Sequence, residues 1–300
     1  MKKRSILLLW IILCIGLLPQ ISALGASDSQ ASMTLYYQKE GQTFSGLSIG
    51  IYRVAEAFPD GTFELIQPYA SYPVNIHGIT RQEQWNTVAE TLYSYILADQ
   101  VQPDRVEETD DQGMVRFLGL ETGLYFVRET VAENASGAYI FNQFMIYLPQ
   151  QQSDGTVDYE VEAYPKCMAY IPSSQYTVTK LWQDAGNQSS RPKEVTVDIY
   201  QDGILQETQV LSAENNWTYT WSVSPSDQGK WSVAERNVPE EYKVTIQQNG
   251  SNFSLINTRK TQQDPPKTGD TFSPLPWMMV MAGAGVLLLL LGIYGRRKKA

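Results

Sequence analysis

The sequence predicts a mostly β protein with two β-sandwich domains, the first carrying a helical insertion, between an N-terminal signal peptide and a C-terminal membrane-spanning tail. Short runs of alternating apolar residues, rich in Tyr, Val and Thr and separated by Gly, Pro and Asn, recur along the chain. One run has helical spacing instead, and both ends of the chain combine apolar runs with basic residues. The length of 300 residues leaves room for about two domains.

The N-terminus reads MKKRSILLLWIILCIGLLPQISALGA, a basic start followed by an apolar run and small residues. This order is typical of a secretory signal peptide, which we place at residues 1–26; an uncleaved anchor is the alternative. After removal of this segment a single cysteine, Cys167, remains, so no internal disulfide can form. An exported chain of this kind has to hold its strands by packing or by another covalent link.

The part of the chain between the two ends is acidic. Residues 26–268 hold 16 basic and 31 acidic side chains, a net charge of −15, and show no basic patch. Nucleic acid is therefore not an expected partner. His77 is the only histidine, and no Ser/His/Asp set, metal cluster or phosphate loop is present, so we expect no cofactor and no turnover enzyme. A glycosidase that uses carboxylates alone would need a cleft that such small domains hardly supply.

The first domain is expected at residues 33–166, with strands such as GLSIGIYRVA and AYIFNQFMIYLP. Between residues 81 and 98 the apolar positions recur every three or four residues, which predicts one face of an amphipathic helix packed on a sheet. The residues of this face are Trp85, Val88, Ala89, Leu92, Tyr93 and Ile96.

A second domain is expected at residues 175–260, after a short linker at 167–174. It contains about seven short strands separated by turns, which predicts another β-sandwich. The fragments GLYFVRE, ending at Glu129, and GKWSVAE, ending at Glu235, each place a glycine six residues before a glutamate. This likeness indicates a repeated fold.

Strand alternation directs three polar side chains into the core of the second domain. The inward set includes Lys180 in YTVTKLW, Glu235 in WSVAE and Asn257 in SNFSLINT. Burial lowers the pKa of a lysine and raises that of a glutamate, so a neutral amine could attack the Asn257 amide while Glu235 moves protons. The product would be a Lys–Asn isopeptide bond. The alternative is a buried salt bridge between Lys180 and Glu235, capped by Asn257.

Residues 176–258 resemble a Cna B-type domain, the Ig-like module of Gram-positive surface proteins and pili, through VTKLW, WSVAE and INT. The resemblance implies that Lys180 and Asn257 form the isopeptide bond, with Glu235 as the catalytic proton shuttle. The first domain resembles the N-terminal domain of pilins through GIYRVA, DDQGMVRFLGLETGLYFVRE and EAYPK. The fold class implied by both resemblances is two Ig-like, Cna B-type sandwiches.

The pilin resemblance assigns two further residues. Glu129 corresponds to the catalytic glutamate, but LYYQ stands where the lysine is expected, Lys39 comes slightly late, and the last strand, YEVEAYPK, has no asparagine. We therefore expect no isopeptide bond in the first domain. In pilus backbone subunits a YPK lysine accepts the next subunit, and Lys166 matches it, although Cys167 replaces the family's following asparagine. An ordinary exposed lysine is the alternative.

The C-terminal segment 264–300 contains PPKTG, an uncharged 19-residue run at 277–295 and a basic end. The run is long enough to span the roughly 30 Å core of a bilayer, and a plain membrane anchor would explain it. PPKTG resembles the LPXTG sorting signal, with Pro265 in place of leucine. The resemblance implies cleavage by a sortase between the last two residues of the motif Pro266, Lys267, Thr268 and Gly269.

Together the resemblances imply an exported structural protein, covalently anchored to the cell wall of a Gram-positive bacterium, and in particular a pilus subunit. Its partners would be a sortase, a peptidoglycan precursor and other pilin subunits, with membrane contact through the C-terminal run before processing. The alternative is a monomeric wall-anchored adhesin, or a basal pilin, that binds a host or matrix ligand. Such a protein would use Thr268 but not Lys166.

Overall fold

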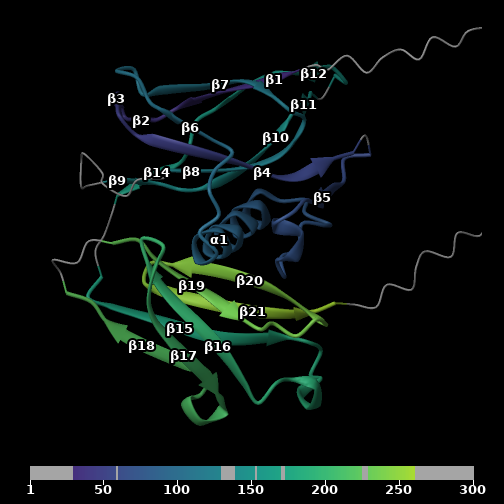
Figure 1. Cartoon of the computed structure of the whole chain (residues 1–300), viewed down its shortest axis with the longest axis vertical. Helices are drawn as coiled ribbons and strands as arrows, with labels where there is room; N and C mark the ends of the chain where they lie inside the picture. The colour runs from purple at the N-terminus through teal and green to yellow at the C-terminus, as the bar shows by residue number, and fades with distance from the viewer. Residues whose placement is uncertain are drawn as a thin grey trace, which may run out of the picture. The chain divides into compact units, whose positions relative to one another are not determined.

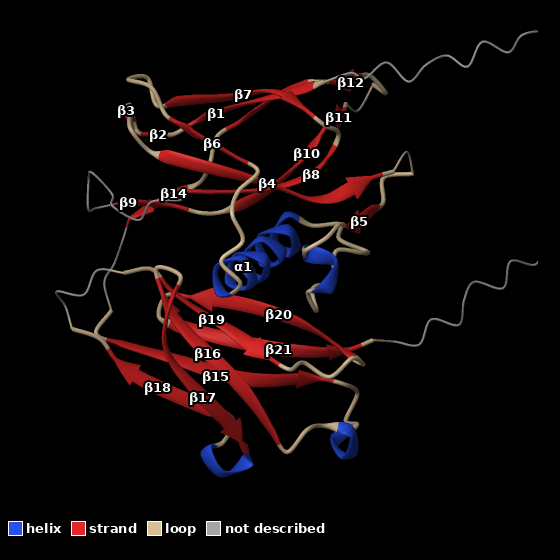
Figure 2. Cartoon of the chain, viewed as in Figure 1, coloured by secondary structure: helices blue, strands red, loops and turns tan. Residues whose placement is uncertain are grey.

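The computed structural model describes residues 30–58, 60–129, 139–152, 154–169, 173–224 and 229–260. Figure 1 follows the chain through these ranges, and Figure 2 separates strands from helices. The fold is mostly β, as the sequence predicts, with one α-helix in the described part. The described residues up to Arg259 form one compact unit that contains both predicted domains. The predicted signal peptide at 1–26 and the predicted sorting segment at 264–300 lie outside the described residues.

The first domain contains two main sheets. One has the order β13-β1-β7, and the other has the order β10-β8-β4-β5, with β6 also paired to β4. Three small ribbons join β2 to β3, β11 to β12 and β9 to β14. The strands are β1 Ala31–Tyr36, β2 Gln38–Lys39, β3 Gln42–Thr43, β4 Ser48–Ala57, β5 Phe63–Leu65, β6 Arg105–Glu108, β7 Met114–Leu120, β8 Gly123–Glu129, β9 Tyr139–Phe141, β10 Phe144–Leu148, β11 Gln150–Gln151, β12 Val157–Asp158, β13 Glu160–Ala163 and β14 Cys167–Ala169.

The core of the first domain lies between its two main sheets. Alternate residues of β1 point into this core, so Met33 and Leu35 are fully buried there with Phe117 and Val127. β1 runs parallel to β13 and antiparallel to β7, which places the first strand of the domain beside the last strand of the same sheet in chain order. The segment predicted as a linker begins with a strand, because β14 pairs with β9.

Within the described residues 173–224 and 229–260, the second domain is a sandwich of seven strands, in agreement with the prediction of about seven. One sheet has the order β18-β15-β21-β20 and the other has the order β17-β16-β19. β15 and β21, the first and last strands, are parallel neighbours. The strands are β15 Gln175–Gln183, β16 Glu194–Gln201, β17 Ile204–Ser212, β18 Thr218–Ser222, β19 Trp231–Arg236, β20 Tyr242–Asn249 and β21 Asn252–Arg259. Short 3-10 turns occur at Tyr69–Ser71, Gln188–Ser190 and Ala213–Asn215.

The helix expected at 81–98 is α1, Gln82–Ala98. Its N-terminus is capped because the Gln84 side chain accepts hydrogen bonds from the backbone N–H groups of Thr80 and Arg81. The apolar face predicted from the spacing is buried except for Trp85, which is half-buried. Polar residues of other faces, including Thr91 and Ser94, are buried as well. The helix packs on strands of both domains, since α1 contacts β10 of the first domain and β19 and β20 of the second.

The region around α1 covers the open edge of β20. The backbone N–H of Ile246 donates to Thr91 Oγ1 at 2.9 Å, and the N–H of Val244 donates to the Pro73 carbonyl at 2.7 Å. Edge strands expose unpaired backbone groups that invite pairing with other chains, so this cover protects the sheet. Arg236 adds a contact at the end of the helix, donating to Asp99 Oδ1 at 2.9 Å. The two domains thus share one buried core around α1.

Candidate functional site

Three strands of the second domain bring Lys180, Glu235 and Asn257 together in its core. β15 and β21 are hydrogen-bonded neighbours, with Lys180 opposite Leu255 and Trp182 opposite Asn257, while β19 belongs to the facing sheet. The three polar residues are 3%, 1% and 0% exposed, respectively. Strand alternation therefore directs inward the same side chains that the sequence pattern singled out.

The carboxyl group of Glu235 contacts both the amine and the amide. Lys180 Nζ lies 3.6 Å from Glu235 Oε2, and Asn257 Nδ2 donates a hydrogen bond to Glu235 Oε1 at 2.8 Å. Glu235 Oε2 and Asn257 Oδ1 are both buried and have no hydrogen-bond donor among the described residues. A buried polar atom left without a partner costs about 1–3 kcal/mol, so the three groups touch without completing their hydrogen bonding.

Lys180 lies in an environment that favours the neutral amine. Burial lowers its pKa to about 8, and the nearby Glu235 carboxylate only partly opposes this effect. The amine donates to the carbonyl oxygens of Leu181 at 2.9 Å and Leu255 at 3.2 Å. Its Nζ also lies 4.1 Å from the centre of the Trp182 ring. No pattern in the sequence indicated that Trp182 would contact the lysine amine.

Glu235 is buried in the same way, and its pKa moves in the opposite direction. Burial raises the pKa of its carboxyl group, while Lys180 and the Asn257 hydrogen bond act against the shift. The backbone carbonyl of Glu235 accepts a hydrogen bond from the Tyr95 hydroxyl of α1 at 3.1 Å. The helix therefore helps to fix the strand position that carries the carboxyl group. No sequence signal could reveal this contact, because the two residues are far apart in the chain.

The first domain contains a similar glutamate with different neighbours. Glu129 is the last residue of β8, and Glu235 lies near the end of β19. Burial raises the pKa of Glu129 to about 7. Tyr37, at an inward position just after β1, is buried, and the Glu129 charge contributes to raising the pKa of its phenol. Lys39 instead forms an ion pair of 3.9 Å with Glu40 at the surface. The groups that interact electrostatically with Glu129 thus include the Tyr37 phenol and the Lys230 amine.

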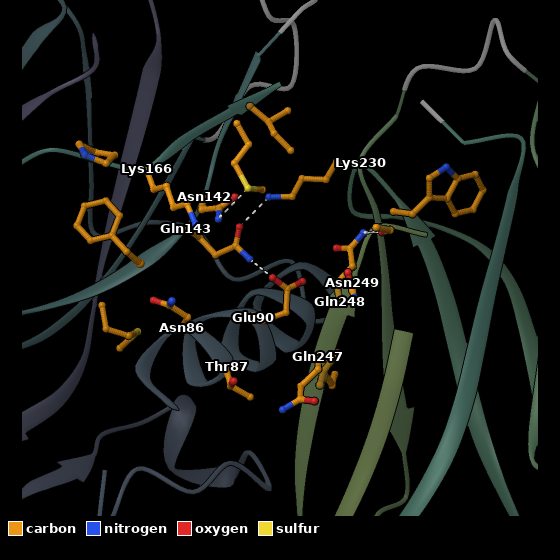
Figure 3. Close-up of a pocket in the computed structure, with 18 of the residues that line it drawn as sticks. Asn86, Thr87, Glu90, Asn142, Gln143, Lys166, Lys230, Gln247, Gln248 and Asn249 are labelled. Atoms are coloured by element: carbon orange, nitrogen blue, oxygen red, sulfur yellow. Dashed lines mark hydrogen bonds between the residues drawn. The ribbon is translucent and has the colours of Figure 1, made fainter. Parts of the chain in front are cut away.

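Lys166 is exposed at the end of the first domain. Its position is fixed on both sides, because the preceding Tyr164 stacks on Tyr36 with ring centres 4.9 Å apart and the Lys166 carbonyl accepts from the Asn142 N–H at 3.0 Å. The residue borders an open cleft of about 1060 Å³ that is lined by residues of the first domain, including α1, and of the second domain (Figure 3). Cys167 follows as a half-buried free thiol in β14, and burial raises its pKa.

The remaining sequence predictions concern segments outside the described residues. These are the sorting motif residues Pro266, Lys267, Thr268 and Gly269 and the apolar run at 277–295. Within the ranges that the structure covers, no helix has both the length and the apolar character needed to cross a bilayer. The same ranges contain no group of three His, Cys, Asp or Glu side chains arranged to hold a metal ion.

One relative is similar in sequence to part of this chain. The Collagen adhesin of Staphylococcus aureus is 34% identical over 105 residues, which is 33% of this chain and 9% of that protein. The chain thus spans less than a tenth of the length of this relative. The likeness concerns a stretch about the size of one domain and does not extend to the whole adhesin.

Two solved structures give weaker likenesses. A single B repeat unit of the collagen-binding surface protein of S. aureus is 18% identical, covers 77% of this chain and 98% of its own, and has a TM-score of 0.27. The full-length major pilin SpaD of Corynebacterium diphtheriae is 10% identical, with the same two coverages and a TM-score of 0.29. Scores this low do not establish a shared arrangement of the whole chains.

The family comparison agrees in its boundaries with the seven-stranded sandwich. The family described as Cna protein B-type domain matches residues 176–258, which begin within β15 and end within β21. The matched range contains all three residues of the buried contact, Lys180, Glu235 and Asn257. Residues 176–258 of this chain therefore form a Cna B-type domain.

Proposed function

We propose that this chain is a structural protein of the Gram-positive cell surface whose second domain is locked by an isopeptide bond between Lys180 and Asn257. One observation carries the proposal: a lysine, a glutamate and an asparagine share a buried contact in which two acceptor atoms have no hydrogen-bond donor. A salt bridge that served only to stabilise the fold would leave these two buried acceptors without hydrogen bonds, which costs folding free energy. A bond-forming reaction between the lysine and the asparagine accounts for the contact, because it requires all three groups to meet.

The reaction begins with the neutral amine of Lys180, which attacks the side-chain carbonyl carbon of Asn257. The Nζ–Cγ bond forms and the Cγ–Nδ2 bond breaks, and one proton passes from Nζ through the Glu235 carboxyl group to the departing nitrogen, which leaves as ammonia. A half-turn of the Asn257 amide, whose oxygen and nitrogen have nearly the same shape, would present Oδ1 to protonated Glu235. Fixed proximity supplies most of the rate, and the reaction occurs once per chain.

The decisive measurement is the mass of the peptides released from the full-length chain by trypsin. We expect the peptides that contain Lys180 and Asn257 to emerge joined, at a combined mass lower by about 17 Da, because one ammonia is lost in the amide-forming step. Glu235→Gln keeps the shape of the side chain but cannot carry the proton, so its two peptides should emerge separate.

Exposed residues of the same domain supply matched controls. Glu194→Gln on β16 and Asn252→Ala on β21 alter side chains that are exposed and outside the contact, so both variants should keep the joined peptide. Separate, unmodified peptides from the folded parent chain would rule out the bond. The contact would then be the buried salt bridge that the sequence left open.

The second part of the proposed function is covalent assembly. A sortase would cut between Thr268 and Gly269 and pass the Thr268 carbonyl either to an amine of a peptidoglycan precursor or to Lys166 of another copy. The PPKTG motif supports the first step, and the exposed place of Lys166 at the end of the first domain supports the second. Use of both residues would make the protein a pilus subunit.

A monomeric adhesin is the second candidate, favoured by the match to a protein named Collagen adhesin. Lys166→Arg in cells that carry the matching sortase separates the two, because arginine keeps the charge but offers no lysine amine for transfer. A pilus subunit should lose its ladder of wall-linked polymers, whereas Lys193→Arg, at another exposed lysine, should keep it. A ladder that survives Lys166→Arg would exclude Lys166 as the acceptor, and a parent chain without any ladder would favour the adhesin.

A further inference from the structure

A second set of amine, amide and carboxyl groups lies where the two domains meet. Glu90 comes from α1, Gln143 from the turn between β9 and β10, and Lys230 from the residue just before β19. Figure 3 shows the three side chains converging among the residues that line the cleft bordered by Lys166. Lys230 belongs to the second domain, and the other two residues belong to the first. The Lys180 site does not use any of them.

Gln143 is the centre of the cluster. Lys230 Nζ donates a hydrogen bond to Gln143 Oε1 at 2.8 Å, and Gln143 Nε2 donates a hydrogen bond to Glu90 Oε2. Gln143 is only 8% exposed, and the second carboxyl oxygen of Glu90 is shielded from solvent without a donor among the described residues. The amine therefore lies next to the carbonyl end of the amide, and the carboxyl group holds the nitrogen that would leave.

The surroundings shift both ionisable groups toward their neutral forms. Burial lowers the pKa of the Lys230 amine and raises the pKa of the Glu90 carboxyl group, and their mutual attraction acts against both shifts. Arg128 also lowers the pKa of Lys230. The Nζ of Lys230 lies 4.1 Å from the centre of the Tyr93 ring, which packs against the lysine from the next turn of α1.

Backbone contacts fix the lysine in place. The Lys230 N–H donates to Asp202 Oδ1 at 2.8 Å, and the Asp202 N–H donates to the Lys230 carbonyl at 2.9 Å. The Lys230 side chain thus extends from a backbone position that is fixed by hydrogen bonds, and it reaches the first domain. Such fixed placement is what makes intramolecular reactions between poorly reactive groups fast.

We propose that Lys230 and Gln143 form a second isopeptide bond, which joins the two domains, with Glu90 as the proton carrier. The Lys230 Nζ–Gln143 Cδ bond forms and the Cδ–Nε2 bond breaks. Glu90 gives a proton to the departing Nε2 and regains one from Nζ, so ammonia leaves and the carboxyl group returns to its starting state. This bond is independent of the Lys180–Asn257 bond, since it uses other residues and links segments on either side of the domain boundary.

The test is a tryptic peptide map of the full-length chain, compared with the Lys230→Arg and Glu90→Gln variants. We expect the Gln143 and Lys230 peptides of the parent chain to appear as one linked species, lighter by about 17 Da through the loss of one ammonia. Lys230→Arg should abolish this species while its charge preserves the contact with Gln143. Glu83→Gln, on the exposed first turn of α1, is the matched control for Glu90→Gln and should leave the link intact.

The two proposed bonds give separable results. A linked Gln143–Lys230 species without a linked Lys180–Asn257 species would support this inference and defeat the proposed lock of the second domain. The reverse pattern, with the Gln143 and Lys230 peptides recovered quantitatively as separate species from the folded parent chain, would overturn this inference alone. Because the peptides of the parent chain decide between these outcomes, the test does not depend on whether any variant folds.

Discussion

Replacement of Lys180 by methionine tests the lock of the second domain most sharply. Methionine has about the length of the lysine stem, so it fills the core without creating a large cavity. It removes the only atom that can bond to Asn257, and Glu235 can stay buried in its neutral form. The change therefore isolates the effect of the covalent link from the effect of packing.

The size of the effect follows from the loop that the bond closes. Residues 180 and 257 bound a loop of about 78 residues, and the chain-entropy model for cross-links gives about 4.5 kcal/mol for closing it. Both residues belong to one compact unit that ends at Arg259. For a cooperative unit of roughly 230 residues, 1 kcal/mol shifts the Tm by about 2–4 °C. The expected fall in Tm is therefore about 9–18 °C.

The assay is thermal unfolding of the full-length parent and variant chains in the same detergent, followed by circular dichroism. Asn257→Ala removes the same bond from its other end and should show a loss of similar size. A Tm of Lys180→Met equal to or above that of the parent would refute the reasoning. That result is expected if the contact is an unlinked ion pair, since replacing a buried ion pair by apolar residues is often neutral or stabilising.

Three further changes have defined outcomes. In Asn257→Ala, Lys180 stays free with a pKa of about 8, below that of the unfolded chain, so the unfolded state binds more protons. The free energy of unfolding should then rise by on the order of 2 kcal/mol from pH 8 to 9.5, as measured by urea titration, and adding Lys180→Met should abolish the rise. Thr91→Val leaves the Ile246 N–H without its acceptor and should cost about 1–3 kcal/mol in urea unfolding, whereas Thr87→Val should cost less. Gly113→Ala should destabilise by more than about 1 kcal/mol in the same assay, because φ is +71° and the new Cβ would meet the Tyr37 carbonyl oxygen.

The helix shows how far sequence periodicity reaches. Spacing alone predicted α1 and the face that carries Leu92 and Ile96. It could not predict the burial of Thr91 and Tyr95, because polar residues on a second face of a helix normally face water. Their burial depends on docking against strands about 150 residues later in the chain. Contacts of that range leave no periodic signal in the sequence.

The two clusters differ in the same respect. Lys180, Glu235 and Asn257 lie within regular strands, so alternation alone revealed that all three point inward. The other cluster combines a helix residue, a turn residue and a residue that precedes a strand. No common period relates these positions, so only the fold could reveal that Glu90, Gln143 and Lys230 meet.

The two proposed bonds would carry different loads in a fibre joined through Lys166 and Thr268. Tension along the fibre would act on each subunit at Lys166, which follows the main strands of the first domain in the sequence, and at Thr268. The covalent path would run from residue 166 to 180, cross to 257 and continue to 268, so it would bypass the rest of the second domain. The Lys230–Gln143 bond lies off this path and would bear no axial load. Its effect would be to hold the first domain, with α1, over the edge of β20, where a separated domain would leave that edge open to pairing with other chains.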